Sequence, residues 1–323
     1  MTSITRRDCL KHIATAGAAI AASLPADAAS NSLFFKIALG EYSFNPLFRA
    51  GKYDPLQLAS LTRKEFGLSA IDYVSSFWEE KAQDRNFLRE LKKRAGDNGI
   101  TNHIILVDLP QPELGDLDAR RRKGAVEAHR PWIDVARFLG CSGIRVNLNE
   151  VERPGQKEAV LEASVDGYGR LLEYGAQHEI DVLVQNHLGY SCDPNWLVRV
   201  MQQVNNKHAG VEADPGHFQE LFIVNKPQGG HTAHMGQSFD LYAGLQTLMP
   251  YSKAVNAKTH AFDAHGNETS FDYSRILKIV KSAGYSGFIG IEWEPAGEGK
   301  NTRVFQGILD TKALLEKDGS LLS

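Results

Sequence analysis

The chain has 323 residues, of which 42% are hydrophobic and 23% are charged. This composition is typical of a globular protein that can bury a large core. The formal net charge of −3 at pH 7 provides no basic surface for a nucleic-acid partner, so we expect none.

The first 29 residues have the pattern of an export signal. Arg6 and Arg7 precede an Ala-rich run, Ile13–Leu24, and small residues follow at Pro25–Ala28. The run is shorter than the roughly 20 residues that span a bilayer. We predict a twin-arginine signal peptide at residues 1–29 and a periplasmic or secreted protein without a membrane segment once the signal is removed. An amphipathic first helix is the alternative.

Two cysteines, Cys141 and Cys192, remain after this signal. An oxidising compartment would allow a disulfide between them, and two buried free thiols are the alternative.

After the signal, short apolar runs alternate with helical patterns. We predict helices at Asp84–Gly96, Ser164–His178 and Tyr273–Ala283, because their apolar residues recur at helical spacing. The predicted strands are Phe35–Tyr42, Ala70–Val74, His103–Val107, Gly143–Asn147, Asp181–Asn186, Gly210–Ala213, Ala254–Lys258 and Phe288–Trp293. Eight such repeats indicate a single-domain α/β fold, a (β/α)8 TIM barrel over residues 33–318.

One connection is unusually long for a compact barrel. Residues Phe218–Ser238 contain Pro227 and Gly229-Gly230 and show no helical pattern. Two interpretations remain open, a lid or substrate loop and a disordered surface excursion.

Polar side chains gather at the ends of the four later strands. Alternation along a strand directs Glu292 and Glu294 toward the barrel axis, with Ile291 and Trp293 facing the helices. The same parity brings further side chains to this rim: Gln185, His187, Asp214, His217, Asn256, Lys258 and His260. Carboxylates and imidazoles together suit a divalent metal such as Mn²⁺, Mg²⁺, Co²⁺ or Zn²⁺, which could stabilise an enediolate. Aromatic residues that could stack on a sugar ring are Tyr42, Phe44, Phe77 and Trp78, whereas Trp293 belongs to the core by its parity.

These segments resemble the xylose-isomerase-like barrel family of sugar phosphate isomerases and epimerases. The resemblance rests on Lys36–Leu39 with Tyr42-Ser43, Ile71–Val74, Gln185–Gly189, Asp214–Phe218, Ala257–Thr259 and Gly284–Glu292. It implies one divalent metal held by Glu, Asp, His and Glu, with the two glutamates acting as an acid–base pair. Asp214 and Glu292 match two ligands, and His217 matches a substrate-contacting histidine. Gln185 and Asn256 depart from the pattern, which implies weaker metal binding and impaired two-base epimerisation.

From these observations we assign candidate roles. The catalytic candidates are Glu292, His217 and Lys258. The metal-ligand candidates are Asp214, Glu292, Gln185 and His260, and the substrate-binding candidates are His187, Asn256, Glu294 and Trp78.

The main functional hypothesis is a metal-assisted isomerase or epimerase of a non-phosphorylated sugar or keto-sugar, because sugar phosphates are mostly cytoplasmic. The alternatives are a 3-keto-glycoside lyase or hydrolase using the same site and a catalytically silent sugar-binding barrel. A phosphodiester-cleaving relative would need a basic surface and more His and Asp ligands than we can place. A small sugar is the expected partner, and a homo-oligomer is compatible with the sequence.

Overall fold

The computed structural model describes residues 33–109, 112–151, 153–225, 231–295 and 303–323. The predicted signal peptide at residues 1–29 lies outside these ranges. Within them, no helix is both long enough and apolar enough to span a membrane.

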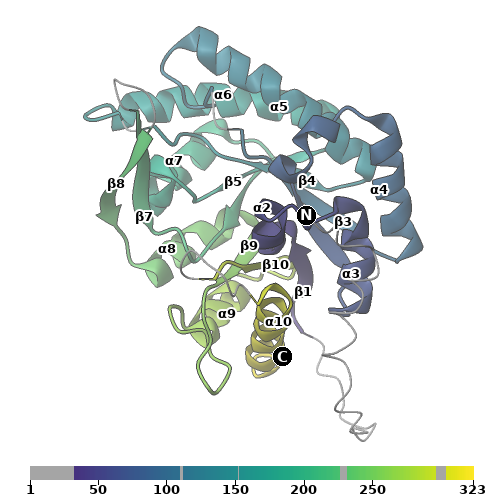
Figure 1. Ribbon diagram of the computed structural model, residues 1–323. Helices are drawn as coiled ribbons and strands as arrows, with labels where there is room; N and C mark the ends of the chain where they lie inside the picture. Colours follow the sequence, from purple (N-terminus) through teal and green to yellow (C-terminus); the bar gives the residue numbers. More distant parts are fainter. Residues whose placement is uncertain (1–32, 110–111, 152, 226–230, 296–302) are drawn as a thin grey trace, which may run out of the picture. The chain divides into compact units, whose positions relative to one another are not determined.

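In the described part of the chain, eight parallel strands close into a barrel, which confirms the predicted fold (Figure 1). Around the barrel the strands follow the order β1, β10, β9, β6, β5, β4, β3 and β2. Their bounds are β1 Lys36–Gly40, β2 Ala70–Val74, β3 Thr101–Leu106, β4 Gly143–Val146, β5 Asp181–Gln185, β6 Ala209–Ala213, β9 Ser252–Thr259 and β10 Phe288–Trp293. Because all eight run parallel, their carboxyl ends meet at one rim.

Helices surround the barrel and bury its outer face (Figure 1). They are α2 Asn45–Arg49, α3 Leu58–Lys64, α4 Arg85–Asp97, α5 Ala119–Leu139, α6 Lys157–Gln177, α7 Pro194–Val204, α8 Leu241–Leu248, α9 Tyr273–Ser282 and α10 Val304–Ser320. Local chemistry sets their ends. At α4, for example, the Asp84 carboxylate accepts hydrogen bonds from the backbone N–H groups of Asn86 and Phe87.

The three predicted helices correspond to α4, α6 and α9 within a few residues, except that α6 begins seven residues before the predicted Ser164. The predicted strands at Ala70–Val74 and Phe288–Trp293 coincide with β2 and β10. Strand β9 is longer than predicted and begins at Ser252, since Ser252 and Lys253 add polar positions that carry no strand pattern.

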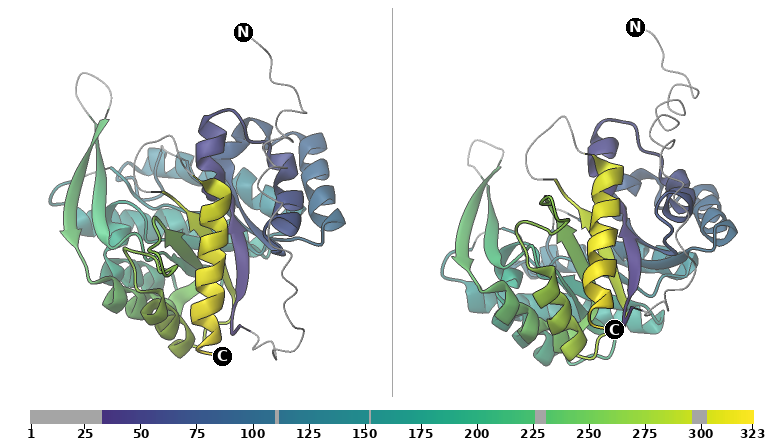
Figure 2. Two further views of the ribbon diagram at one scale, coloured as in Figure 1. Left: turned by 60° about the horizontal axis from the view of Figure 1, so that its bottom comes forward. Right: turned by 90° about the horizontal axis from the view of Figure 1, so that it is seen from below.

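The long connection after β6 is an antiparallel hairpin, β7 Gln219–Asn225 and β8 His231–Ser238. For residues 218–225 and 231–238, which the structure describes, the interpretation as a disordered excursion is therefore wrong. Phe222, Ile223 and Val224 have high strand propensity, and pairing with β8 stabilises them. We looked for a helical pattern in this stretch of the sequence and therefore did not predict the hairpin. Figure 2 shows the hairpin standing out from the edge of the barrel.

Cys141 and Cys192 are both buried and both free. The structure therefore shows two buried thiols and not a disulfide between these residues. Burial raises the pKa of each thiol above its ordinary value. Both side chains are therefore protonated, unreactive parts of the packed interior.

Candidate active site

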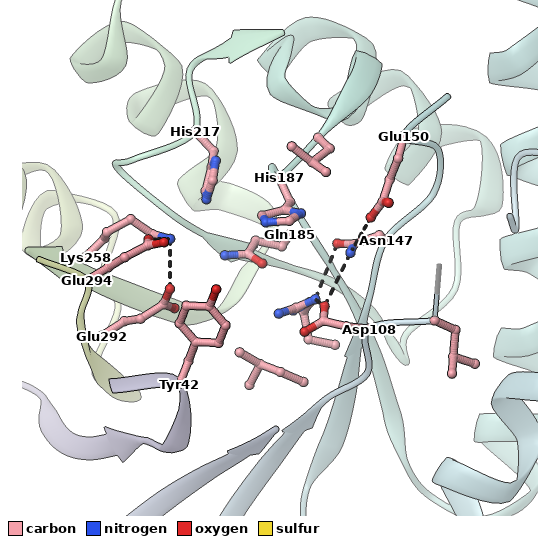
Figure 3. Close-up of a pocket in the computed structure, with 14 residues that line it drawn as sticks. Tyr42, Asp108, Asn147, Glu150, Gln185, His187, His217, Lys258, Glu292 and Glu294 are labelled. Atoms are coloured by element: carbon pink, nitrogen blue, oxygen red, sulfur yellow. Dashed lines mark hydrogen bonds and ion pairs between the residues drawn. The ribbon is translucent and has the colours of Figure 1, made fainter. Parts of the chain in front are cut away.

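A pocket of about 280 Å³ opens where the barrel strands end (Figure 3). Residues from β1, β3, β4, β5, β6, β9 and β10, or from the loops that directly follow them, contribute to its wall. They are Tyr42, Leu106, Asp108, Leu109, Arg145, Asn147, Glu150, Gln185, His187, Leu188, His217, Lys258, Glu292 and Glu294. A pocket at the carboxyl end of a parallel barrel is the usual position of an active site in this fold.

One side of the pocket is formed by the Lys258 cluster, which we define as Gln185, Asp214, Asn256, Lys258, Glu292 and Glu294. The Lys258 Nζ atom lies 2.8 Å from Glu292 Oε1, 3.0 Å from Glu294 Oε2 and 3.7 Å from Asp214 Oδ2. The pairing of β9 with β10 places Lys258 directly beside Glu292. A Cβ at Gly216 would lie 2.5 Å from Lys258 Cδ, so the absence of a side chain at Gly216 leaves room for the lysine.

Charge in this cluster is compensated. Burial alone lowers the pKa of Lys258, but the carboxylates of Glu292, Asp214 and Glu294 outweigh it and raise that pKa well above its ordinary value. The lysine is therefore a fixed cation. Burial raises the pKa of Asp214, and Lys258 opposes this shift.

Two amide side chains complete the Lys258 cluster by donating to its carboxylates. Gln185 Nε2 donates to Asp214 Oδ2 over 2.7 Å, and Asn256 Nδ2 donates to the same oxygen over 3.1 Å. Asn256 also donates to Glu292 Oε2. Asn256 and Asp214 lie behind the wall of the pocket, whereas Gln185 reaches it.

Two histidines, His187 and His217, lie next to this cluster with their rings 4.5 Å apart in an edge-to-face arrangement. Burial lowers the pKa of both side chains well below the ordinary value, so both are neutral. His187 Nδ1, His217 Nε2 and Gln185 Oε1 are buried and have no hydrogen-bond partner among the described residues. Because such atoms are costly to leave unpaired, they indicate where a polar ligand would bind.

The opposite side of the pocket carries the Arg145 cluster, which we define as Asp108, Arg145, Asn147, Glu150 and Glu212, the last of which is buried and does not line the pocket. Figure 3 labels Asp108, Asn147 and Glu150 of this cluster. Arg145 Nη1 donates to Asp108 Oδ1 over 2.5 Å, and Arg145 Nε lies 3.4 Å from Glu212 Oε2. Asn147 Nδ2 donates to Glu150 Oε1 over 3.0 Å. Sequence reasoning missed this cluster because it considered only the four later strands. The polar alternation of Arg145 and Asn147 along an apolar strand is the signal that could have revealed it.

The Arg145 cluster contains three carboxyl groups, two of which pair with the guanidinium, and their pKa values diverge. Burial raises the pKa of Glu212 to about 8 against the opposing effect of Arg145. Burial, with the nearby charges of Asp108 and Glu113, raises the pKa of Glu150 to about 7. Burial also opposes the ionisation of Asp108, but the charge of Arg145 and its hydrogen bond to Asp108 outweigh burial and lower the pKa of Asp108.

Two predicted site residues, Trp78 and His260, belong neither to the pocket wall nor to the two clusters behind it. Trp78 is buried in the core, where its indole N–H donates to Glu41 Oε2 over 3.2 Å and its ring packs against Trp132. Its predicted contact with substrate is corrected accordingly, because the turn after β2 directs the indole inward. Tyr42 is the predicted aromatic residue that lines the pocket, whereas Phe44, Phe77 and Trp293 are buried in the core.

His260 is the second exception. Its Nδ1 lies 2.6 Å from the backbone oxygen of Glu294, and its ring packs against Phe271. His260 follows β9 but does not line the pocket, and it is not part of any group of described side chains arranged to hold a metal ion, so its predicted role as a metal ligand is corrected.

The donor set does not fit a divalent metal. Among the described residues, no group of three or more His, Cys, Asp or Glu side chains is arranged to hold a metal ion. At the two positions where the resemblance implies Glu and His, Gln185 and Asn256 direct N–H donors at the carboxylates. The ammonium of Lys258 already neutralises the oxygens of Glu292 that a metal would need.

Comparisons with known proteins agree with this architecture. A 3'-dehydrocarminate deglycosidase alpha subunit from Microbacterium sp is 21% identical over an alignment 308 residues long, and the match covers 78% of this chain and 86% of the relative. The structure of 3-keto-D-glucoside 4-epimerase from E. coli matches with a TM-score of 0.63 and 14% identity, over 86% of this chain and 99% of that one. The structure of the IOLI protein with a zinc atom matches with a TM-score of 0.65 and 13% identity, over 89% and 99% of the two chains.

At these identities the structural likenesses show the shared fold. The family model described as a xylose isomerase-like TIM barrel matches residues 63–309, which is more than half of the chain. The protein therefore belongs to the xylose isomerase-like TIM barrel family.

Proposed function

We propose that this protein removes the proton next to the ketone of a non-phosphorylated keto-glycoside and thereby eliminates the glycosidic substituent. The observation that carries the proposal is the pairing of Glu292 with Lys258 at the wall of the pocket, over 2.8 Å. Two relatives support the substrate class, because their names refer to a 3-keto-D-glucoside and a 3'-dehydro compound that is deglycosylated.

Glu292 is the base in this proposal. Its Oε1 atom lies 2.8 Å from Lys258 Nζ at the wall of the pocket, where a carboxylate can accept a proton from a bound carbon acid. The electrons left behind accumulate on the ketone oxygen. Lys258 offers its N–H groups to that oxygen, where a fixed cation in a partly dry site stabilises the enolate. No step passes through a metal, because the donor set does not fit one.

The charge of the pocket favours a neutral substrate. Its wall carries four carboxyl groups, on Asp108, Glu150, Glu292 and Glu294, but two cationic groups, Arg145 and Lys258. Both cations are already paired with carboxylates. A phosphate would therefore meet net repulsion, whereas hydroxyl groups could bind the unpaired atoms of His187, His217 and Gln185. A neutral substrate also agrees with the twin-arginine export that we propose for the chain.

Isomerisation or epimerisation of the keto-sugar is the second candidate function. It requires a proton to return to a carbon atom, in an epimerase to the face opposite the base. His217 favours it, because its unpartnered Nε2 atom lies in the same pocket. Elimination is the better account because Gln185, at the position of the expected second glutamate, carries an amide, which cannot act as a general acid or base.

The test uses methyl 3-keto-β-D-glucopyranoside in D2O, followed by NMR. We expect deuterium to replace the hydrogen at C2 and methanol to be released. Glu292→Gln should slow both processes by about 100-fold or more, since it removes the base. The matched control is Glu127→Gln on the exposed face of α5, which should leave both rates unchanged.

Other outcomes discriminate between the candidates. Deuterium uptake with an epimer or isomer, and without methanol, would establish the second candidate. Binding of the glycoside without any exchange would contradict both and leave a sugar-binding barrel.

A further inference from the structure

We propose that Glu150 is a catalytic acid that protonates the departing oxygen of the glycoside, from the side of the pocket opposite Glu292. This inference rests on the proposed function. In the step, Glu292 takes the proton from C2, and the electron pair forms the enolate with C3. The C3 carbonyl then re-forms, a C1–C2 double bond appears and the C1–O bond breaks. The leaving oxygen receives its proton from Glu150, so an enone and an alcohol are released.

The position of Glu150 carries the inference. Glu150 follows β4 and lines the same pocket as Glu292, which belongs to β10. Figure 3 shows the two carboxyl groups on opposite sides, with Gln185 and His187 between them. A substrate held in this space would have one carboxyl group on each side. A base and an acid on different sides suit an elimination, since the proton and the leaving group depart from neighbouring carbons.

The backbone around Glu150 is fixed from two directions. Glu113 Oε1 accepts hydrogen bonds from the N–H groups of Glu150 and Val151, and Arg153 pairs with Glu113 Oε2 over 2.6 Å. The backbone N–H of Ile223 in β7 donates to the carbonyl of Glu150 over 2.7 Å. An acidic residue on an ordinary surface loop would not need these supports. They fix the backbone, and the hydrogen bond from Asn147 Nδ2 to Glu150 Oε1 restricts the carboxyl group itself.

The electrostatic surroundings keep Glu150 protonated more readily than an ordinary carboxylic acid. Burial is the main cause, and the charges of Asp108 and Glu113 add to it, while Arg145 and the hydrogen bond from Asn147 oppose it. The resulting pKa of about 7 is close to the working pH of most enzymes. A group with such a pKa can both donate its proton and regain it from water after each turnover.

A comparison of leaving groups tests this role. Methoxide is a poor leaving group and needs a proton, whereas 4-nitrophenolate leaves without one. We expect Glu150→Gln to slow methanol release from methyl 3-keto-β-D-glucopyranoside by about 100-fold or more. The same variant should release 4-nitrophenol from the corresponding 4-nitrophenyl glycoside at nearly the rate of the unchanged protein. Deuterium uptake at C2 should also persist.

The pH profile supplies a second measurement. Methanol release should fall as the pH rises above about 7, because Glu150 then loses its proton. This basic limb should be absent from the 4-nitrophenyl reaction. The groups that share this environment are Asp108, Glu113, Arg145 and Arg153.

Other results would overturn the inference. Equal slowing of both glycosides by Glu150→Gln would indicate a structural role, and no slowing of either would exclude a catalytic one. NMR of the carboxyl carbon would also contradict it if Glu150 titrated in the ordinary range of glutamic acids. Failure of the proposed function is distinguishable, because the unchanged protein would then release neither methanol nor 4-nitrophenol, whether or not it exchanges the C2 hydrogen.

Discussion

The Lys258 cluster and the Arg145 cluster use similar side chains on opposite sides of one pocket, with different results. In the Lys258 cluster, the ammonium is within 4.0 Å of three carboxylates, and amide N–H groups satisfy two of them further. In the Arg145 cluster, the guanidinium pairs closely with Asp108, while Glu150 and Glu212 have pKa values of about 7 and 8. Within the Arg145 cluster, the close charge of Arg145 lowers the pKa of Asp108, whereas burial outweighs that charge at Glu150 and Glu212 and leaves them as acids that retain protons more readily.

Removing the cation of the Lys258 cluster should produce the largest effect. Lys258→Met leaves Asp214 and Glu292 buried without their counter-charge. We expect the free energy of unfolding to fall by roughly 3–5 kcal/mol, measured by chemical denaturation, with loss of proton exchange at C2. Adding Glu292→Gln to this variant should restore part of the stability but none of the activity. A loss well under 1 kcal/mol would show that Lys258 does not hold these carboxylates.

The Arg145 cluster predicts a dependence of stability on pH. Glu212 has a pKa of about 8 in the folded protein against an ordinary value of 4.5. Between these pH values Glu212 keeps its proton in the folded protein but loses it in the unfolded chain. Glu212 therefore lowers the free energy of unfolding as the pH rises. Glu212→Gln removes the effect. The free energy of unfolding of the variant, relative to that of the unchanged protein, should be higher at pH 8 than at pH 5.

Thermal denaturation at both pH values measures this gain. Glu127→Gln, on the exposed face of α5, is the matched control and should show no such difference. An equal shift at both pH values would contradict the assignment of a protonated Glu212.

Trp78 lies outside both clusters, so its replacement should affect stability alone. Trp78→Phe removes the hydrogen bond to Glu41, while Tyr53 and the backbone of Val74 still donate to that carboxyl group. We expect a loss of about 1–2 kcal/mol in denaturation experiments, with KM for the keto-glycoside unchanged. A raised KM would return Trp78 to the substrate-binding residues.

Metal removal should have the smallest effect. Treatment with EDTA is expected to leave the rate of proton exchange unchanged, because Lys258 provides the positive charge. Loss of activity with EDTA, restored by Mn²⁺ or Zn²⁺, would overturn the assignment of that role to Lys258.

A double variant tests the opposite change, the creation of a metal site. Gln185→Glu with Asn256→His introduces the Glu and His ligands that the family pattern has at these positions. It should bind Zn²⁺ in calorimetry where the unchanged protein binds none. Zn²⁺ binding by the variant alone would show that Gln185 and Asn256 are the reason why the unchanged protein does not bind the metal.

The sequence predicted the barrel well because each strand and helix has its own local pattern, as β2, β10 and α9 illustrate. Strand parity also indicated that Gln185, Lys258 and Glu292 would approach one another. It could not predict the direction of the amides of Gln185 and Asn256, since their hydrogen bonds depend on side-chain rotamers in three strands. Glu150 was missed for a related reason. Its environment is created by Glu113 and Ile223, which are distant in the chain.

The β7–β8 hairpin has a consequence for how the family could diversify. One isolated bridge joins Val151 to Ile223, so the loop that carries Glu150 and the hairpin share a backbone contact. Changes in the length or twist of this hairpin would move the acid relative to Glu292 without altering any residue of the pocket. Mutations in the β7–β8 hairpin could thus change which glycosides fit the pocket, while the barrel and Glu292 stay the same.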